Sequence, residues 1–494
     1  MKINKQIIIF SLLPLFLSTL SPVTNKIFFM PKPIQQDIVL QNAMSLEFTN
    51  AMSLEYTKDT DINCGFILIG SLFYEQTTNK KDLAKYFLIN DKTELTIAGN
   101  TSGITDKDIA TEWLGISNWD DMILKQNFSS KINLSPEQKE FGINLQAHKV
   151  LNFISNKLWL SLTLPFIQKE TNLKLNEFNI QNAPTIQPID VPKFMSQNAT
   201  DFFDSVENLR YGKIKNGTQK LAGLADINLK LNYLFKNKKS WTLSFYPQIT
   251  IPTGYKPKSE YIFEPIIGNG RHWELGAGLN FEIELLDKNK HLLSFISKFD
   301  YNYSFESTEK RTFDLKNKPW SRYLRLTDQT TKLINTVAVN LFTQDFKIQP
   351  GSNLNLLLSL HYNNKDFFNL EFGYNLWWKA KEGIKLKNEW VENVGITQLD
   401  GNNNPTGNSI SNATIATNPL GTADISFTTI KIDDLDLNSA IHDSALSNKI
   451  YLSSGIEGTW KQNIYQANLG LAYEFANNKA LSSWSIWLQT NLYI

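Results

Sequence analysis

The chain has 494 residues, of which 42% are apolar, 12% aromatic and 20% charged, a composition that argues against wholesale disorder and against a collagen-like or disulfide-scaffold protein. Its 49 Lys and Arg against 48 Asp and Glu leave a net charge of +1, which provides no field for holding a polyanion, so we predict no nucleic-acid partner. A mean hydropathy of −0.28 and the lack of a second long apolar stretch exclude a polytopic helical membrane protein, but not one that crosses with strands.

Residues 1–24 have the pattern of a secretory signal peptide. Lys2 and Lys5 precede a largely apolar run over residues 7–20, which is too short for a comfortable bilayer span. The alternative, a buried N-terminal helix, lacks the caps and alternating faces that such a helix carries. We therefore expect an exported protein.

Residues 25–61 are predicted to form a periplasmic leader segment. Within it, an octad at residues 42–49 is followed at once by a near copy at 50–57, and one duplication is too few for a repeat fold. The single cysteine, Cys64, excludes an internal disulfide, and its simplest role is that of a small side chain on a strand.

From residue 62 onward, apolar and polar residues alternate with a period of two. Over residues 227–235, for example, apolar residues occupy every second position and Asn228, Lys230 and Asn232 stand between them. The alternating segments run for about 11–15 residues, whereas strands of soluble proteins average about 5–6 and a tilted membrane-crossing strand needs about 9–11. The pattern predicts an all-β protein, with residues 62–494 forming a single transmembrane antiparallel β-barrel that has long outer loops and short periplasmic turns.

The alternation predicts about fourteen strands, and this even number leaves both termini of the barrel chain on the periplasmic side. They are expected near 62–75, 139–154, 157–169, 223–236, 239–251, 272–286, 290–305, 331–347, 351–363, 367–380, 384–392, 448–459, 463–476 and 481–494. Periplasmic turns are expected at 155–156, 237–238, 287–289, 348–350, 381–383 and 460–462, and short outer hairpins near 364–366 and 477–480. The remaining connections are long outer loops, and the first of them contains a further structured segment at 85–98.

The sheet is expected to close into a barrel because it is surrounded by lipid. Each unpaired backbone N–H or C=O in hydrocarbon costs several kcal/mol, so an open sheet edge cannot face lipid. Barrels of this kind lie in the cell outer membrane, where the lipid is a partner of the outer wall. About fourteen strands enclose less space than a porin of 16–18 strands, so we expect loops or the N-terminal segment to occupy part of the lumen.

Aromatic residues gather at the ends of the predicted strands. Amphipathic rings belong at the two headgroup levels, so these residues are predicted to form a membrane girdle, with ordinary core packing as the alternative for each of them. The predicted girdle is Trp159, Phe166, Trp241, Trp273, Trp378, Trp390, Trp460 and Trp484.

The polar faces of the strands are predicted to line a pore. The pore-lining residues are expected to be Asp226, Asn228, Lys230, Asn232, Glu274, Asn280, Glu282, Glu284, Asp300, Asn369 and Glu371. A wider set of interior charges contains nine acidic residues, which are the six acidic residues of the pore lining together with Glu389, Glu457 and Glu474. The same set contains four basic residues, Lys230, Lys298, Lys385 and Lys387. This excess predicts a modest preference for cations.

Catalytic and metal-binding patterns are sparse, and we predict no catalytic residues, no metal and no cofactor. The five histidines show no metal-ligand spacing. A barrel lipid hydrolase would need Ser and His together on the outer face, and Ser359 with His361 is the nearest approach to that arrangement. Solvated or lumen-facing histidine is the simpler interpretation.

The last strand alternates apolar residues up to Ile494, and this end resembles the signal read by the barrel-assembly machinery, although that signal usually ends in an aromatic residue. We therefore expect this machinery as a partner. Here Tyr493 precedes the final position instead of occupying it.

Four short motifs resemble a known family. They are Gly223-Leu224-Ala225-Asp226, Pro252-Thr253-Gly254, Gly268-Asn269-Gly270 and Glu274-Leu275-Gly276. In this order they resemble the outer-membrane barrels of the phenol-degradation meta-pathway family over residues 220–286. The resemblance implies a porin-like channel for small hydrophobic or aromatic compounds.

The predicted function is an outer-membrane channel or transporter through which small solutes pass passively. A structural or adhesive surface protein with a plugged barrel is the first alternative, and a barrel lipid hydrolase is the second. A soluble secreted β protein is the third, and it would be released by buffer without detergent.

Overall fold

The computed structural model describes most of the chain, and the statements below concern those residues. They are 26–40, 65–99, 102–104, 106–110, 127–182, 190–196, 209–238, 240–288, 290–328, 334–364, 368–396, 428–460, 463–476 and 479–494. The predicted signal peptide, the duplicated octad and Cys64 lie outside them.

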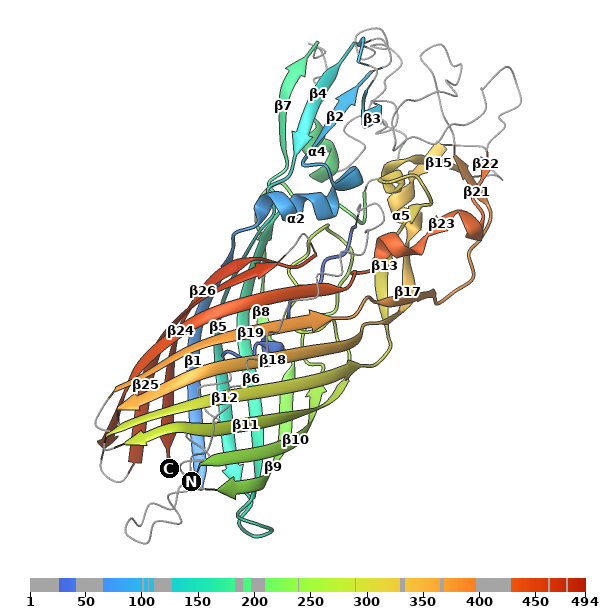
Figure 1. Ribbon diagram of the computed structural model, residues 1–494. Coiled ribbons are helices and arrows are strands. Elements are labelled where there is room, and N and C mark those ends of the chain that lie inside the picture. Colours follow the sequence, from blue (N-terminus) through green and yellow to red (C-terminus); the bar gives the residue numbers. More distant parts are fainter. Residues whose placement is uncertain are drawn as a thin grey trace, which may run out of the picture.

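Twelve antiparallel strands close into a barrel, which confirms the predicted fold class (Figure 1). Strand β26 pairs with β1 from Tyr493 opposite Ile67 to Ser483 opposite Thr77, so the last strand closes on the first. The strands are β1 (Phe66–Thr77), β5 (Glu137–Val150), β6 (Leu158–Asn172), β9 (Ile227–Lys238), β10 (Trp241–Ile251), β11 (Glu274–Lys288), β12 (His291–Ser304), β18 (Gly351–Asn364), β19 (Phe368–Lys379), β24 (Ala445–Trp460), β25 (Asn463–Ala476) and β26 (Ser483–Tyr493).

A short thirteenth strand, β8 (Gln219–Leu224), continues the path of β9. Strand β8 pairs with the outer half of β6, and β9 pairs with the other half of the same strand. Ala225 and Asp226 form the break between the two, so β8 and β9 together occupy one position in the wall.

The outer wall is apolar, as the period of two requires. Along β6, Leu160 and Phe166 belong to the outward row and are exposed, whereas Ser161 and Thr163 on the inward row are buried. Every other barrel strand likewise has at least one exposed large apolar side chain, including Leu360 on β18 and Phe372 on β19. A wall of this kind is stable only against hydrocarbon, which places the barrel in the outer membrane.

Two predicted strands are not part of the barrel. The segments near 331–347 and 384–392 contribute β17 (Thr343–Gln349) and β20 (Gly383–Leu386) to a separate three-stranded sheet. Their alternation is real, but Phe346 and Ile348 pack on a protein core instead of lipid. A period of two does not distinguish these two environments.

This difference reverses the direction of β18 and β19, which lie between the two segments in sequence. Asn364 pairs with His291, at the end of the barrel where the hairpin between β11 and β12 lies. The hairpin predicted on the outer side near 364–366 therefore joins strands on the periplasmic side, and the predicted turns at 348–350 and 381–383 are on the outer side. The hairpin near 477–480 is on the outer side, as predicted, because Ala476 pairs with Ser447 there.

The outer connections fold into a cap with its own secondary structure, seen above the barrel in Figure 1. Its helices are α2 (Lys80–Phe87), α4 (Val191–Ser196) and α5 (Ala338–Phe342). Its remaining strands are β2 (Glu94–Ala98), β3 (Ile109–Ala110), β4 (Ser129–Asn133), β7 (Asn176–Gln181), β13 (Ser307–Thr312), β14 (Asp314–Leu315), β15 (Arg325–Asp328), β16 (Ile334–Val337), β21 (Val394–Ile396), β22 (Thr428–Thr429) and β23 (Leu435–Asp436). Short 3-10 turns complete it at Ile89–Asp91, Ser321–Tyr323, Ile432–Asp434 and Leu437–Ala440.

An apolar core holds the cap together. The rings of Phe313 and Phe342 stack with centroids 4.8 Å apart, and Phe346 and Trp390 meet Phe313 edge-on. Trp320 is fully buried nearby and donates from its indole N–H to the Phe87 carbonyl (3.0 Å). The outer loops are thus a folded layer over the barrel.

Residues 26–40 run from the cap into the lumen and include a single 3-10 turn, η1 (Ile34–Gln36). The Lys26 backbone N–H donates to the Tyr86 carbonyl in the cap (2.9 Å), and the Leu40 carbonyl accepts from Gln146 on the barrel wall (3.4 Å). The dark-blue segment inside the barrel in Figure 1 is this stretch. These residues were predicted to belong to a periplasmic leader, but they lie inside the barrel, in agreement with the expectation that loops or the N-terminal segment occupy part of the lumen. We call them the lumen segment.

No helix among the described residues combines the length and apolar character that a bilayer span requires.

Candidate functional site

The inward rows of the barrel strands form a polar wall. Of the predicted pore-lining residues, nine are buried, namely Asp226, Asn228, Lys230, Asn232, Glu274, Glu282, Asp300, Asn369 and Glu371. The other two, Asn280 and Glu284, are partly buried. The outward neighbours of these residues, such as Leu279, are exposed.

Hydrogen bonds connect the wall across neighbouring strands. The Tyr246 hydroxyl on β10 donates to Asp300 on β12 (2.6 Å), and Gln248 donates to Asn302 (2.7 Å). Gly278 on β11 lies between Tyr246 and Asp300, and a Cβ at Gly278 would lie 2.4 Å from the Tyr246 ring. Glycine therefore leaves room for the tyrosine to cross one strand and reach the carboxylate.

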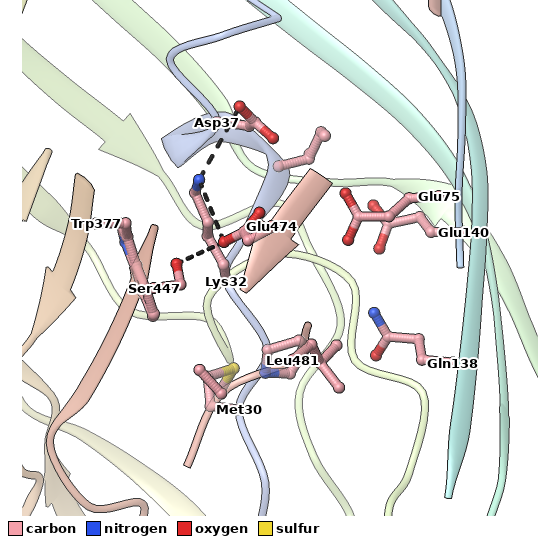
Figure 2. A pocket seen from close by; sticks show the side chains of 13 residues that line it. Met30, Lys32, Asp37, Glu75, Gln138, Glu140, Trp377, Ser447, Glu474 and Leu481 are labelled. Atoms are coloured by element: carbon pink, nitrogen blue, oxygen red, sulfur yellow. Dashed lines mark hydrogen bonds and ion pairs between the residues drawn. The ribbon is translucent and has the colours of Figure 1, made fainter. Parts of the chain in front are cut away.

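Ion pairs fix the middle of the lumen segment to the wall (Figure 2). The Lys449 ammonium on β24 lies 2.6 Å from Asp37 of the lumen segment and 2.9 Å from Glu474 on β25. Lys32, also in the lumen segment, lies 3.9 Å from Glu474 and donates to Asn375 on β19 (3.2 Å). Four of these groups are more than nine-tenths buried, so each depends on its partners for solvation.

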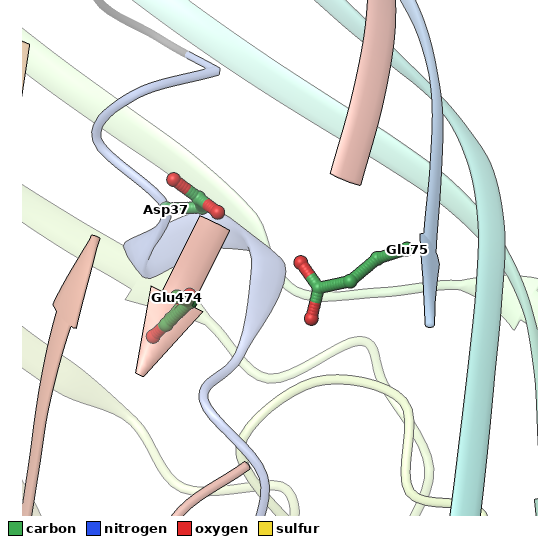
Figure 3. A group of neighbouring side chains, drawn as sticks. All are labelled: Asp37, Glu75 and Glu474. Carbon is green, nitrogen blue, oxygen red and sulfur yellow. The ribbon is translucent and has the colours of Figure 1, made fainter. Parts of the chain in front are cut away.

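Asp37, Glu75 and Glu474 form a carboxylate group whose oxygens lie within 4.8 Å of one another (Figure 3). This is the spacing that a cation site requires, but the Lys449 ammonium already stands among all three, at 3.8 Å from Glu75. The positive charge that the carboxylates need is supplied by a side chain of the protein.

Beside this cluster is a cavity of about 30 Å³, lined by Met30, Lys32, Glu140, Trp377 and other residues drawn in Figure 2. A space of this size holds about one or two water molecules. Charged groups line it, so water is the occupant that its chemistry fits.

Gln36 is bound to three different strands of the wall. Its amide N–H donates to Glu274 on β11 (3.1 Å), and its amide oxygen accepts from the Trp377 indole on β19 (3.1 Å). Its backbone carbonyl accepts from Asn355 on β18. All these contacts are polar, although Ile34, Ile38, Val39 and Leu40 of the same segment also pack in an apolar cluster within the lumen.

The Asp226 carboxylate brings together three of the four motifs that carry the family resemblance. It accepts from the Gly254 backbone N–H (2.9 Å) and the Asn269 backbone N–H (2.7 Å). It also accepts from Gln35 of the lumen segment (2.8 Å). The same residue thus binds the break in the wall, the loop after β10 and the lumen segment.

Glycine is required at Gly254 and Gly268 because the Asp226 oxygens lie where a side chain would begin. A Cβ at Gly254 would clash with the Ile267 carbonyl oxygen and lie 2.8 Å from one Asp226 oxygen, and a Cβ at Gly268 would be 2.6 Å from the other Asp226 oxygen. Gly268 also has a φ of +83°, in the left-handed region that other residues seldom adopt. The Gly-rich turn is therefore a close-packed support for the carboxylate.

The predicted girdle residues lie in different places. Phe166, Trp273 and Trp484 are on the outer surface with exposed fractions of 46%, 50% and 39%, and Trp241 and Trp378 are partly exposed. Trp159, only 5% exposed, belongs to the inward row of β6 and packs near Val150 and Leu234, because it is one residue out of step with the leucines of the outward row. Trp390 packs in the cap, and the side chain of Trp460 lies outside the described part of the chain.

The predicted interior charges also differ in part from the charges that the structure places inside the barrel. Lys385, Lys387 and Glu389 are exposed and belong to the β20 region outside the barrel. Asp37, Glu75 and Lys449 were not predicted. The inward row of β24 could have revealed Lys449, but no local signal connects Asp37 with a partner 412 residues away.

Ser359 and His361 do not meet the requirement for a lipid hydrolase. Both side chains lie on the inward row of β18 and are buried, with exposed neighbours such as Leu360 on the lipid side. The Ser359 hydroxyl and the His361 Nδ1 have no hydrogen-bond partner among the described residues. The alternative of a barrel lipid hydrolase therefore loses the two residues on which it depended.

A buried charged network marks the outer mouth of the barrel. His272 Nε2 lies 2.5 Å from Glu309 on β13, and Arg311 pairs with both Glu309 (2.7 Å) and Glu382 (3.1 Å). Burial alone would lower the pKa of His272, but the hydrogen bond to Glu309 and its charge raise that pKa above the usual value of 6.5. The Arg311 guanidinium lies over the ring of Phe28 in the lumen segment, so the network also fixes the outer end of that segment.

Comparisons with known proteins give only distant likenesses. No protein-family model matches the chain, and no curated protein matches it. Among solved structures, it is similar to an outer membrane channel from Pseudomonas putida F1, with 10% identity, a TM-score of 0.36, and coverage of 86% of this chain and 95% of that one. It is also similar to a FadL homologue from Pseudomonas aeruginosa (8% identity, TM-score 0.29, coverage 87% and 90%) and to the CymD monoaromatic hydrocarbon channel (10%, 0.28, 90% and 92%). Likenesses of this strength do not identify a function for this chain.

Proposed function

We propose that the protein is an outer-membrane channel for the passive passage of small solutes, and that the lumen segment, residues 26–40, is a displaceable plug. The observation that carries this proposal is the nature of the contacts at Lys32, Gln36 and Asp37. They are hydrogen bonds and ion pairs to a polar wall. Water can replace such partners, so the polar groups of both surfaces remain solvated when the segment moves away.

The solute path runs along the inward polar rows, which include Asn228, Glu274, Asn280 and Glu371. Acidic groups outnumber basic ones on the predicted path even after Glu389, Lys385 and Lys387 are removed from it. A displaced plug therefore leaves a lumen that favours cations. Reversal potentials measured in a salt gradient would show this preference, and anion selectivity would contradict it.

Small hydrophobic or aromatic compounds are the solute class we favour, and two considerations support it. The motif residues around Asp226, whose resemblance is to a phenol-degradation family, lie at the lumen segment. In addition, the apolar cluster around the segment includes Phe73, Tyr451 and Trp487, whose rings would contact an aromatic solute once the plug has moved.

Thiol labelling in planar bilayers tests the channel directly. In a chain that carries Cys64→Ser, Asn280→Cys places a thiol on the inward row, and Leu279→Cys places one on the adjacent outward position. A charged methanethiosulfonate reagent is expected to reduce the conductance of the Asn280→Cys channel and to leave the Leu279→Cys channel unchanged. Equal effects on both variants would contradict passage through the lumen.

The folded cap supports the alternative function, a surface protein whose barrel is a plugged anchor. Its core is apolar and extends over several outer connections, as a binding platform would require. Under this alternative the native chain conducts no ions in planar bilayers, and loosening the lumen segment does not change that result. Stepwise conductance from the native chain favours the channel.

A further inference from the structure

An apolar groove of about 610 Å³ crosses the outside of the barrel near the seam where β26 closes on β1. Ligand sites commonly have volumes of roughly 300–1,000 Å³. Its outward-facing lining comes from five adjacent strands and comprises Leu68, Gly70, Leu145, Ala147, Leu162, Leu164, Tyr465, Ala467, Thr490 and Leu492.

The groove exists because small residues interrupt a row of large ones. Gly70, Ala147 and Ala467 form its floor, and leucines such as Leu68 and Leu145 form its walls. A Cβ at Gly70 would make only ordinary contacts, with its nearest atom 3.6 Å away, so the chain is not forced to have glycine there. In a bilayer such a hollow is filled by hydrocarbon, because an unfilled one forfeits dispersion contacts along its whole lining.

A lysine stands at the periplasmic end of this groove. Lys149 lies on the outward row of β5, two residues beyond Ala147, which corresponds to about 7 Å along the strand. Its side chain is exposed and its ammonium lies 6.0 Å from the centre of the Phe66 ring. No carboxylate among the described residues pairs with it. Since β5 ends at Val150, this cation lies at the level of the periplasmic headgroups.

We propose that the groove and Lys149 together bind one anionic glycerophospholipid of the periplasmic leaflet. One acyl chain lies along the floor formed by Gly70, Ala147 and Ala467, and the phosphate lies beside the Lys149 ammonium. The groove supplies the shape and the lysine supplies the preference for negative charge. This inference depends on the barrel's place in the membrane and is independent of what passes through the lumen.

Native mass spectrometry of the full chain tests the proposal. The detergent-solubilised protein is mixed with equal amounts of phosphatidylglycerol and phosphatidylcholine that carry identical acyl chains. The native chain is expected to retain one phosphatidylglycerol with about fivefold preference, the factor that one surface lysine contributes. Lys149→Gln is expected to remove this preference, and Ala147→Leu combined with Ala467→Leu is expected to reduce retention of both lipids.

Two matched variants control for general effects on the outer wall. Lys236→Gln removes another exposed lysine near the periplasmic end of the barrel, and Ala277→Leu enlarges an outward residue on β11. Both should retain lipid as the native chain does, and a heat-dependent mobility shift on electrophoresis shows that each barrel is folded. Equal retention of the two lipids by the native chain would overturn the proposal, as would unchanged retention after the groove is filled.

Discussion

The lumen segment and the cap both cover the barrel interior, but the lumen segment adds ion pairs and amide hydrogen bonds to its apolar contacts, whereas the cap is centred on an apolar core. The cap has a dry core in which Phe313, Phe342 and Trp390 pack against one another. The middle of the lumen segment is instead bound through Lys32, Gln36 and Asp37 to a polar wall. An apolar core has no substitute in water, whereas ion pairs and amide hydrogen bonds do, so we expect the segment to leave its place more readily than the cap.

Of the substitutions considered, Lys449→Met is expected to have the largest effect on the difference in stability between the lumen segment and the cap. The substitution leaves Asp37, Glu75 and Glu474 close together without their shared cation, and breaking a buried ion pair costs about 3–5 kcal/mol. The lumen segment should loosen while the cap remains folded. Hydrogen exchange of the Gln36 and Asp37 amides, which bond within η1, would report this loosening.

Lys236→Met is the control for that experiment, because Lys236 is exposed near the end of β9. It should leave the exchange of the Gln36 amide unchanged. Protection of that amide in the Lys449→Met chain equal to that in the native chain would show that the ion pairs do not hold the segment.

Phe313→Ala should have the converse effect, since it removes a fully buried ring from the cap. Truncation of a buried phenylalanine costs about 3–5 kcal/mol. Limited proteolysis should then cut the cap connections more rapidly, with the barrel and the exchange of the Gln36 amide little affected. Equal loosening of the cap and the lumen segment would mean that the two regions are one cooperative unit.

A smaller effect is expected from Gln36→Leu, which removes the amide contacts with Glu274 and Trp377 but no charge of its own. Loss of hydrogen bonds to a charged group and to an indole is worth about 2 kcal/mol. Amide exchange at Asp37 should accelerate less than in Lys449→Met. Gln168→Leu, at an exposed outward position of β6, is the matched control.

The smallest effect concerns pH at the outer mouth. Because the folded pKa of His272 is raised above 6.5, its pairing with Glu309 contributes stability that is complete below pH 6.5 and is lost as pH rises through the folded pKa. Proteolysis of the cap should therefore become faster above pH 6.5. His272→Gln should remove this dependence, and a cap equally resistant at pH 5.5 and pH 8.5 in the native chain would contradict the pairing.

The sequence was sufficient to predict the barrel because lipid and lumen impose opposite polarity on alternate residues of the same strand. It failed at β17 and β20, where the same alternation faces the cap core through Phe346 and Ile348. Local periodicity carries no information about which apolar medium a strand touches. Because these two segments were counted as barrel strands, β18 and β19 were predicted to run in the direction opposite to the one observed.

The candidate site was predicted in part for a similar reason. The inward position of residues such as Asn228 and Glu371 depends only on the period of the strand. The carboxylate of Asp226 was on the predicted path, but its partners at Gly254, Asn269 and Gln35 come together only through the tertiary fold. The pairing of Asp37 with Lys449 spans almost the whole chain and has no sequence signature.

Single-channel conductance after replacement of residues 32–38 by a Gly-Ser segment of equal length tests the central claim most directly. The replacement keeps the chain length and the cap contacts of Phe29, and it removes the contacts of Lys32, Gln36 and Asp37 with the wall. We predict stepwise conductance clearly larger than that of the native chain, with a preference for cations. Conductance that is absent both before and after the replacement would contradict a plugged channel.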